Sequence, residues 1–204
     1  MRITRLLFFI IGIAVLTLGV SFTLKAKLGA GPWDALAAGQ TKTFGFTVGT
    51  WVIVNGILLL FVNAYLLRQK PQFLACITFI LIGTMIDFWL LKVFNDWEPT
   101  DLMYRGSVLL TGIVLIAIGV AMYIQSQYPT NPIDNLMIAL HTRFGVSLMV
   151  AKTIGEMAAL VFAIMMKGPI GVGTLIVAFT IGPIIQFFYG RVGRFMNKVG
   201  SLLR

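Results

Sequence analysis

The segment "GAGPWDALAAGQTKTFG" (residues 29–45) returns in altered form as "PTNPIDNLMIALHTRFG" (residues 129–145). Both copies place a proline at the first helical position and an aspartate in the first turn, where the helix dipole favours a negative charge. Asn131 is a good N-cap and Gly31 holds the same place in the first copy, while Gly45 and Gly145 end the segments. Each copy therefore predicts a short amphipathic helix. The five identical positions are Pro32/Pro132, Asp34/Asp134, Leu36/Leu136, Phe44/Phe144 and Gly45/Gly145.

The match extends on both sides of this motif. Gly12, Ile13, Gly19 and Val20 also recur one hundred residues later, and "IGTMIDF" from Ile82 meets "IGPIIQF" from Ile181 at an offset of 99. Each copy holds three hydrophobic runs, an odd number, so the second copy must enter a bilayer in the opposite direction. This predicts two inverted repeats, an organisation found in many secondary transporters. Repeat 1 spans about residues 1–92, an outer linker 93–104, repeat 2 105–190 and a basic interfacial tail 191–204.

The composition is that of a membrane protein. Of the 204 residues, 58% are hydrophobic and 11% are charged, whereas soluble domains carry about 25% charged residues. A membrane-spanning helix needs about 20 mainly apolar residues, and the runs are too long and too continuous for barrel strands. We expect an all-α polytopic membrane protein with six transmembrane helices in a single transmembrane domain. The runs are Leu6–Leu24, Val48–Leu67, Phe73–Leu91, Ser107–Ile124, Ser147–Met166 and Pro169–Tyr189.

Sixteen Lys and Arg residues outnumber seven Asp and Glu residues. They cluster at the ends of the runs, so anionic lipid headgroups explain them better than nucleic acid. Their distribution predicts that both termini are cytoplasmic and that the acidic linker "FNDWEPTD" lies outside. Lys25, Lys27 and Lys42 fit this orientation least, because they fall on the predicted outer side.

Ionisable groups inside the fifth run are the first candidates for a site. A charge at the bilayer centre costs about 2.5–3.5 kcal/mol on insertion scales. Glu156 lies ten residues into the run and is the best candidate for a carboxylate linked to a proton or a cation. Lys152 lies four residues earlier on the same helix face, so the two can also form a purely structural pair.

The remaining site candidates come from the repeated elements. The motif helix starts at Gly31–Pro32 and Asn131–Pro132 offer backbone N–H groups. Asp34 and Asp134 would oppose an anion there and suit a proton, a metal cation or an amine, or they simply cap the helices. Asp87 either reaches the outer interface or faces a lumen, and its repeat counterpart is Gln186.

Other residues exclude several kinds of chemistry. Cys76 is the only cysteine and His141 the only histidine, so neither a disulfide nor a metal site is expected. No nucleotide-binding or catalytic motif is present, and we expect neither an enzyme nor a cofactor. Asn55 and Asn63 are expected to hold helices together, as are glycines such as Gly12 and Gly19.

With "LGAGPWDALAAGQTKTFGFTVGTW" after the first run and its echo "NPIDNLMIAL", the sequence resembles the YczE/YyaS/YitT family of prokaryotic integral membrane proteins, on the YczE branch. The likeness covers nearly the whole chain. It implies a helical membrane fold in the prokaryotic cytoplasmic membrane. It implies no substrate and no catalytic residue.

Two functions stay open at this point. One is a small-solute or ion-coupled permease, for a small polar or cationic solute, suggested by the inverted repeat and the acidic residues. The other is a membrane-embedded accessory or regulatory protein that acts through a protein partner, because almost no chain lies outside the runs. A weaker third interpretation is a lipid-handling protein. A homo-oligomer is compatible with each of them.

Overall fold

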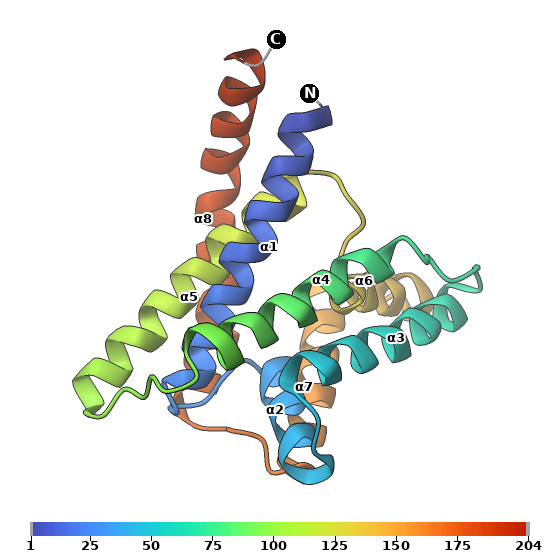
Figure 1. Ribbon diagram of the computed structural model, residues 1–204. Helices are drawn as coiled ribbons and strands as arrows, with labels where there is room; N and C mark the ends of the chain where they lie inside the picture. The colour runs from blue at the N-terminus through green and yellow to red at the C-terminus, as the bar shows by residue number, and fades with distance from the viewer. Residues whose placement is uncertain (1, 203–204) are drawn as a thin grey trace. The chain divides into compact units, whose positions relative to one another are not determined.

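The computed structural model describes residues 2–202 and the side chains of residues 3–201. All of its regular elements are helices (Figure 1), and residues 2–202 contain no strand. The helices are α1 (Arg2–Lys25), α2 (Pro32–Phe44), α3 (Val48–Leu67), α4 (Ala75–Phe88), the π-helix η1 (Trp89–Val93), α5 (Leu102–Gln125), α6 (Pro132–Phe144), α7 (Leu148–Met165) and α8 (Val172–Leu202).

Six of these helical segments are long and apolar enough to cross a membrane. They are α1, α3, α4 continued by η1, α5, α7 and α8, which match the six predicted runs. The all-helical membrane fold is therefore confirmed, and the chain is an integral membrane protein. The predicted basic tail is not a separate element here, because α8 continues through it to Leu202.

The two short motif helices, α2 and α6, form as expected and have 13 residues each. At α6 the Asn131 side chain accepts a hydrogen bond from the backbone N–H of Ile133, and Gly145 ends the helix with φ 68°. Gly45 holds the same left-handed conformation after α2, with φ 79°. Glycine adopts this conformation without the steric penalty of a side chain.

The helices after the motifs begin alike. Thr47 precedes α3 and accepts a hydrogen bond from the backbone N–H of Thr50, while Ser147 precedes α7 and accepts one from Val150. These N-caps are one hundred residues apart. The offset of one hundred residues that separates α2 from α6 therefore also separates the start of α3 from the start of α7.

Contacts divide the chain into two compact units. Unit 1 comprises residues 1–31, 88–128 and 171–204, and so contains α1, η1, α5 and α8. Unit 2 comprises residues 32–87 and 129–170, which hold α2, α3, α4, α6 and α7. Each unit draws on both halves of the chain.

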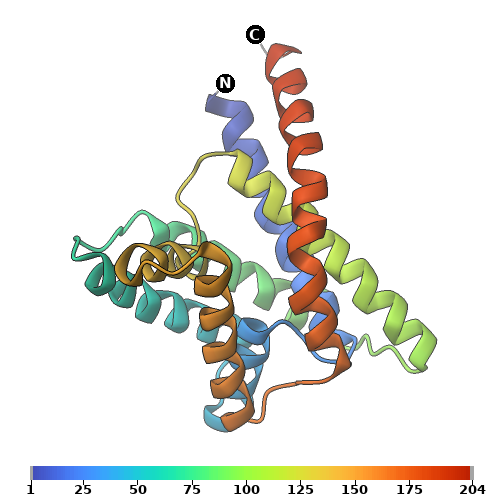
Figure 2. The same cartoon turned by 180° about the vertical axis from the view of Figure 1, so that it is seen from behind.

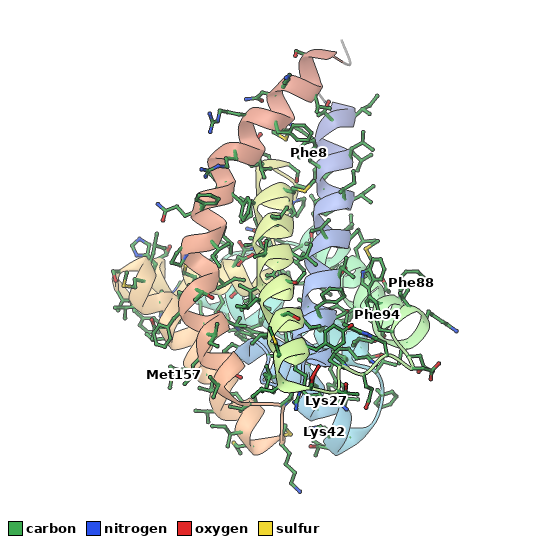
Figure 3. All side chains as sticks on the ribbon, turned by 90° about the vertical axis from the view of Figure 1, so that its left-hand side faces the viewer. Phe8, Lys27, Lys42, Phe88, Phe94 and Met157 are labelled. Carbon is green, nitrogen blue, oxygen red and sulfur yellow. The ribbon has the colours of Figure 1, made fainter. Side chains whose placement is uncertain are left out.

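In unit 1, α1 packs closely against α5, with α8 beside them (Figure 1). A Cβ atom added at Gly19 would lie 2.6 Å from the carbonyl oxygen of Gly112, and one added at Gly12 would lie 2.8 Å from the backbone N of Tyr123. These glycines allow the two backbones to touch, as predicted. The ring of Phe8 on α1, labelled in Figure 3, lies 6.0 Å from the ring of Phe195 on α8.

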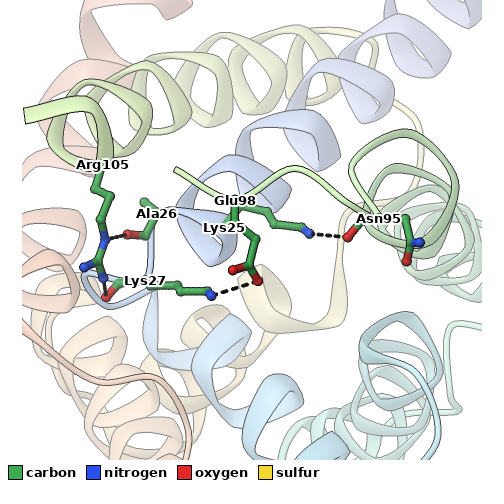
Figure 4. Close-up of polar contacts among 6 residues, drawn as sticks. All are labelled: Lys25, Ala26, Lys27, Asn95, Glu98 and Arg105. Carbon is green, nitrogen blue, oxygen red and sulfur yellow. Dashed lines mark hydrogen bonds and ion pairs between the residues drawn. The ribbon is translucent and has the colours of Figure 1, made fainter. Parts of the chain in front are cut away.

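A polar cluster joins the end of α1 to the linker before α5 (Figure 4). Lys27 forms an ion pair with Glu98 at 2.8 Å, and Lys25 donates to the carbonyl oxygen of Asn95. The hydrogen bond from Lys27, together with the charges of Lys27 and Lys25, lowers the pKa of the Glu98 carboxyl. Arg105 donates to the carbonyl oxygens of Ala26 and Lys27. Two of the three lysines that fitted the predicted orientation least, Lys25 and Lys27, thus have partners in the linker.

In unit 2, α2 packs on α3 and α7, and α6 packs on α3 and α7. Figure 2 shows α6 beside α3 from behind. Asn63 on α3 donates to the carbonyl oxygen of Pro132 at 2.8 Å, and Thr78 on α4 donates to that of Pro129 at 2.7 Å. Buried polar side chains therefore hold the start of α6 against α3 and α4, the role expected for Asn63.

Candidate functional site

A partly open cavity of about 390 Å³ lies in unit 2, among α2, α3, α6 and α7. We call it the central cavity. Its volume falls within the range of small-molecule sites, about 300–1,000 Å³. Its lining residues are Trp33, Leu36, Gln40, Asn55, Leu58, Leu59, Val62, Leu66, Leu136, Leu140, Ile154, Gly155, Ala158, Ala159, Phe162 and Met166.

The lining of the central cavity follows the sequence repeat. Fourteen of these sixteen residues form seven pairs separated by one hundred positions; only Trp33 and Ile154 lack a partner in the lining. The cavity is therefore built from equivalent positions of both copies. The pairs are Leu36/Leu136, Gln40/Leu140, Asn55/Gly155, Leu58/Ala158, Leu59/Ala159, Val62/Phe162 and Leu66/Met166.

One amide pair supplies most of the polar surface of this mainly apolar cavity. Gln40 Nε2 donates to Asn55 Oδ1 at 3.1 Å, and Asn55 Nδ2 donates to Gln40 Oε1 at 2.8 Å. The two side chains satisfy each other and join α2 to α3. The equivalent residues of the second copy, Leu140 and Gly155, cannot form such a pair. The cavity thus has amide groups only on the side of the first copy.

The predicted acidic residues lie on neighbouring helices of unit 2. Burial, and to a smaller extent the charge of Glu156, raises the pKa of Asp34 to about 7. Glu156 is itself in electrostatic range of Lys152 and of Asp134. Among the side chains of residues 3–201, no ion pair joins Lys152 to Glu156. Asp34, Asp134 and Glu156 therefore form one electrostatic group, although none of them lines the central cavity.

The predicted residues Asp87 and Gln186 are not brought together in one unit. Asp87 on α4 accepts two hydrogen bonds from the start of α3. Thr47 Oγ1 donates one at 2.5 Å, and the backbone N–H of Gly49 donates the other at 2.7 Å. A carboxylate there complements the positive end of the α3 dipole. Gln186 lies on α8, in unit 1. The helix starts at Pro32 and Pro132 both lie in unit 2, and Asn131 caps the second.

Unit 2 holds a second cavity, of about 340 Å³, between α3, α6 and the loop that follows α3. We call it the α3–α6 cavity. It shares no lining residue with the central cavity. The residues that line it are Leu60, Asn63, Ala64, Leu67, Gln69, Lys70, Gln72, Pro132, Asn135, Ile138 and Thr142.

Sequence reasoning missed most of the residues around both cavities. It took Asn55 only as a helix contact and did not single out Gln40 or Lys70. A signal was available in α3, where Asn55, Leu59, Val62 and Leu66 recur at helical spacing and so share one face. That spacing alone does not distinguish a cavity lining from a packed helix contact.

Comparison with known proteins places the sequence in a family. The model of the "Family of unknown function (DUF6198)" matches residues 3–190. YyaS of Bacillus subtilis is 36% identical over 195 residues, which cover 95% of this chain and 97% of that protein. YczE of the same organism, named a membrane protein, is 35% identical over 91% of this chain and 85% of its own length.

A protein of Haemophilus influenzae is 28% identical over 89% of the chain and 82% of its own length. No solved structure matches. The resemblance to YczE and YyaS expected from the motif after the first run is confirmed. The chain therefore belongs to the DUF6198 family.

Proposed function

We propose that this protein is a small-solute permease built from two inverted repeats, with its solute site in the central cavity. The observation that carries the proposal is the lining of that cavity, which consists almost entirely of equivalent positions from the two copies. Transporters of this architecture bind their solute where the repeats meet.

The helix contacts of unit 2 support the inverted repeat. Helix α2 packs on α7, and its counterpart α6 packs on α3, the counterpart of α7. Likewise, the contact between α2 and α3 corresponds to the contact between α6 and α7. Exchanging the two copies therefore reproduces the same set of contacts. Such a pattern is expected if a pseudo-twofold axis relates them.

The chemistry of the lining indicates an amphipathic solute. Leucine, valine, alanine and aromatic side chains would cover an apolar body, and the amides of Gln40 and Asn55 would exchange hydrogen bonds with a polar group. The carboxyl groups of Asp34, Glu156 and Asp134 nearby favour an amine over an acid. Small amines with a hydrocarbon or aromatic body combine these properties.

Asp34 supports proton coupling. A carboxyl group with a pKa near 7 changes its charge within the physiological range, which a group with an ordinary carboxyl pKa does not. The charge of Glu156 contributes to the raised pKa of Asp34, and Glu156 is in turn in electrostatic range of Lys152 and Asp134. Uptake of an amine would then depend on pH.

The test is solute uptake into proteoliposomes that contain the purified full chain. Primary amines such as benzylamine would be compared with neutral analogues such as benzyl alcohol, while an internal pH dye records proton movement. Gly155→Leu fills the central cavity, because an added Cβ there meets only Leu136, at 3.4 Å. Gly106→Leu on α5 is the matched control, since nothing lies within 4 Å of a Cβ at that position.

We expect Gly155→Leu, and independently Ala158→Phe, to reduce uptake at least tenfold while Gly106→Leu transports normally. The combined change Asp34→Asn with Glu156→Gln should abolish the accompanying proton movement. Uptake that survives both cavity-filling changes would overturn the site. Uptake without any proton movement in the unmodified protein would overturn the coupling and leave the site intact.

A further inference from the structure

A buried side chain that lines the α3–α6 cavity, Asn63, has a polar atom without a partner among the described residues. Asn63 is 6% exposed, and its Nδ2 donates to the carbonyl oxygen of Pro132. Its Oδ1 has no hydrogen-bond partner among the described residues. Leaving a buried acceptor unpaired costs about 1–3 kcal/mol. A ligand that donates a hydrogen bond to Asn63 Oδ1 would recover that cost.

The equivalent place in the other copy is filled by apolar side chains. The counterpart of Asn63 is Ala163, which is fully buried in a small apolar cluster with Ala35 and Leu36. There, the loop after α7 closes on α2: a Cβ added at Gly39 would lie 2.8 Å from the backbone N of Gly168. The same fold can therefore fill this position with apolar side chains. In the α3–α6 cavity it leaves space and a polar lining instead.

The remaining lining groups define the chemistry of the ligand. Lys70 brings a positive charge, while Gln69, Gln72, Asn135 and Thr142 bring amide and hydroxyl groups. Lys70 is the only charged residue of this lining, so the charge of the lining is positive and favours an anion. An anion that also carries hydroxyl groups suits both of these residues. Its charge pairs with Lys70, and one of its hydroxyl groups donates a hydrogen bond to Asn63. Phosphate is a common partner of lysine.

We propose that the α3–α6 cavity binds a glycerophosphate group, with its phosphate at Lys70 and a hydroxyl group at Asn63 Oδ1. The group has two sources, the headgroup of phosphatidylglycerol and free glycerol 3-phosphate. The proposal does not depend on the permease function, because the two cavities have separate linings.

Native mass spectrometry of the full chain in mild detergent tests the lipid source. Phosphatidylglycerol is added in competition with phosphatidylethanolamine, whose headgroup has a phosphate but carries an ammonium in place of the hydroxyl groups. We expect phosphatidylglycerol to be retained preferentially. Asn63→Ala and Lys70→Gln should each weaken its binding about fivefold to tenfold, the equivalent of one hydrogen bond to a charged or buried group. Lys92→Gln on η1 removes the same charge elsewhere and should leave binding unchanged.

Glycerol 3-phosphate tests the free source by isothermal titration calorimetry and by competition with the retained lipid. Displacement of the lipid by glycerol 3-phosphate, dependent on Asn63, assigns the site to the headgroup chemistry itself. Lipid binding that depends on Asn63 and Lys70 but resists displacement assigns it to the intact lipid. Lys70 is exposed, so Lys70→Gln remains informative if Asn63→Ala does not fold. Equal retention of the two lipids, or binding unchanged by Lys70→Gln, would overturn the proposal.

Discussion

The helix pairs α2–α7 and α3–α6 occupy equivalent places in the two sequence repeats, but they differ in packing. We call α2–α7 the closed pair and α3–α6 the open pair. At α2–α7 the loop after α7 seals the contact: Thr43 donates to the carbonyl oxygen of Met166 and Lys42 to that of Lys167. At α3–α6 the corresponding loop, residues 68–74, is one residue longer than residues 166–171 and leaves a cavity. The two sequence repeats therefore have the same helix contacts here but differ in packing.

The difference follows the side chains at a few positions. Ala35 and Ala163 are small and fully buried, which permits close approach in the closed pair. Their counterparts, Asn135 and Asn63, are larger and polar, and both line the α3–α6 cavity. Small apolar residues thus occupy these positions in the closed pair, and amide side chains occupy them at the α3–α6 cavity.

Placing the amide in the closed pair should have the largest effect. Ala163→Asn forces a larger polar side chain into a filled apolar cluster, and we expect a loss of about 3 kcal/mol in unfolding free energy from overpacking and an unpaired amide. The reciprocal change, Asn63→Ala, removes one hydrogen bond and one unpaired acceptor and should cost less than about 1 kcal/mol. Equilibrium unfolding in mixed micelles measures both. Equal costs would show that the two places do not differ in packing.

A side chain at Gly168, in the loop after α7, should have the next largest effect. A Cβ at Gly168 would meet the backbone carbonyl of Ala35, which cannot move as a side chain can. We expect Gly168→Ala to cost about 2 kcal/mol through this backbone displacement. Gly106→Ala, in open space on α5, should change stability little by the same unfolding measurement. A Gly168→Ala protein as stable as this control would contradict the sealed geometry.

Making the first copy resemble the second tests the amide pair of the central cavity. Asn55→Ala leaves the half-buried Gln40 amide unpaired and should cost about 1.5 kcal/mol. Adding Gln40→Leu, the residue type of Leu140, should recover part of that loss because no unpaired amide remains. A double-mutant cycle in the same micelles measures the coupling. Strictly additive costs would mean that the pair contributes no mutual stabilisation.

The remaining effect is a dependence of stability on pH, and it concerns Asp34, at the start of the helix of the closed pair. Its folded-state pKa, about 7, exceeds its ordinary value of 3.8, so the folded state holds a proton that the unfolded state releases. Stability should therefore fall as the pH rises from about 4 to about 7 and then stay level.

Asp34→Asn should remove this slope, which we place below about 1 kcal/mol per pH unit because the residue is only half-buried. Asp96→Asn in the linker serves as the charge control. The unfolding temperature between pH 4 and pH 8 provides the measurement, and a slope that survives Asp34→Asn would assign it to another group.

Much of this fold could be predicted from local sequence. Long apolar runs predicted the six membrane-spanning helices, and the Asn-Pro and Gly signals around residues 131–145 predicted α6 within a residue at each end. The end of α8 could not be predicted, because a basic amphipathic tail has the same pattern whether it begins a new helix or continues one.

The site was less accessible to sequence reasoning. Glu156 stands out because a charged residue is costly inside a membrane, and Asp34 and Asp134 stand out because the motif repeats them. In the structure, Glu156 is in electrostatic range of both. The central cavity depends instead on which apolar faces meet across four helices. The local sequence around a leucine does not show whether that leucine lines a cavity or packs against a neighbouring helix. The pairing of Gln40 with Asn55 likewise depends on the angle between α2 and α3, which local sequence does not set.

The amide pair of Gln40 and Asn55 has one more consequence. If the two halves of the central cavity were identical, an elongated molecule would bind equally well in either orientation, because both of its ends would meet the same residues. With amides on one wall and Leu140 and Gly155 on the other, the two directions differ in energy. The two amides thus give the cavity a polar end, and any elongated molecule inside it a preferred orientation.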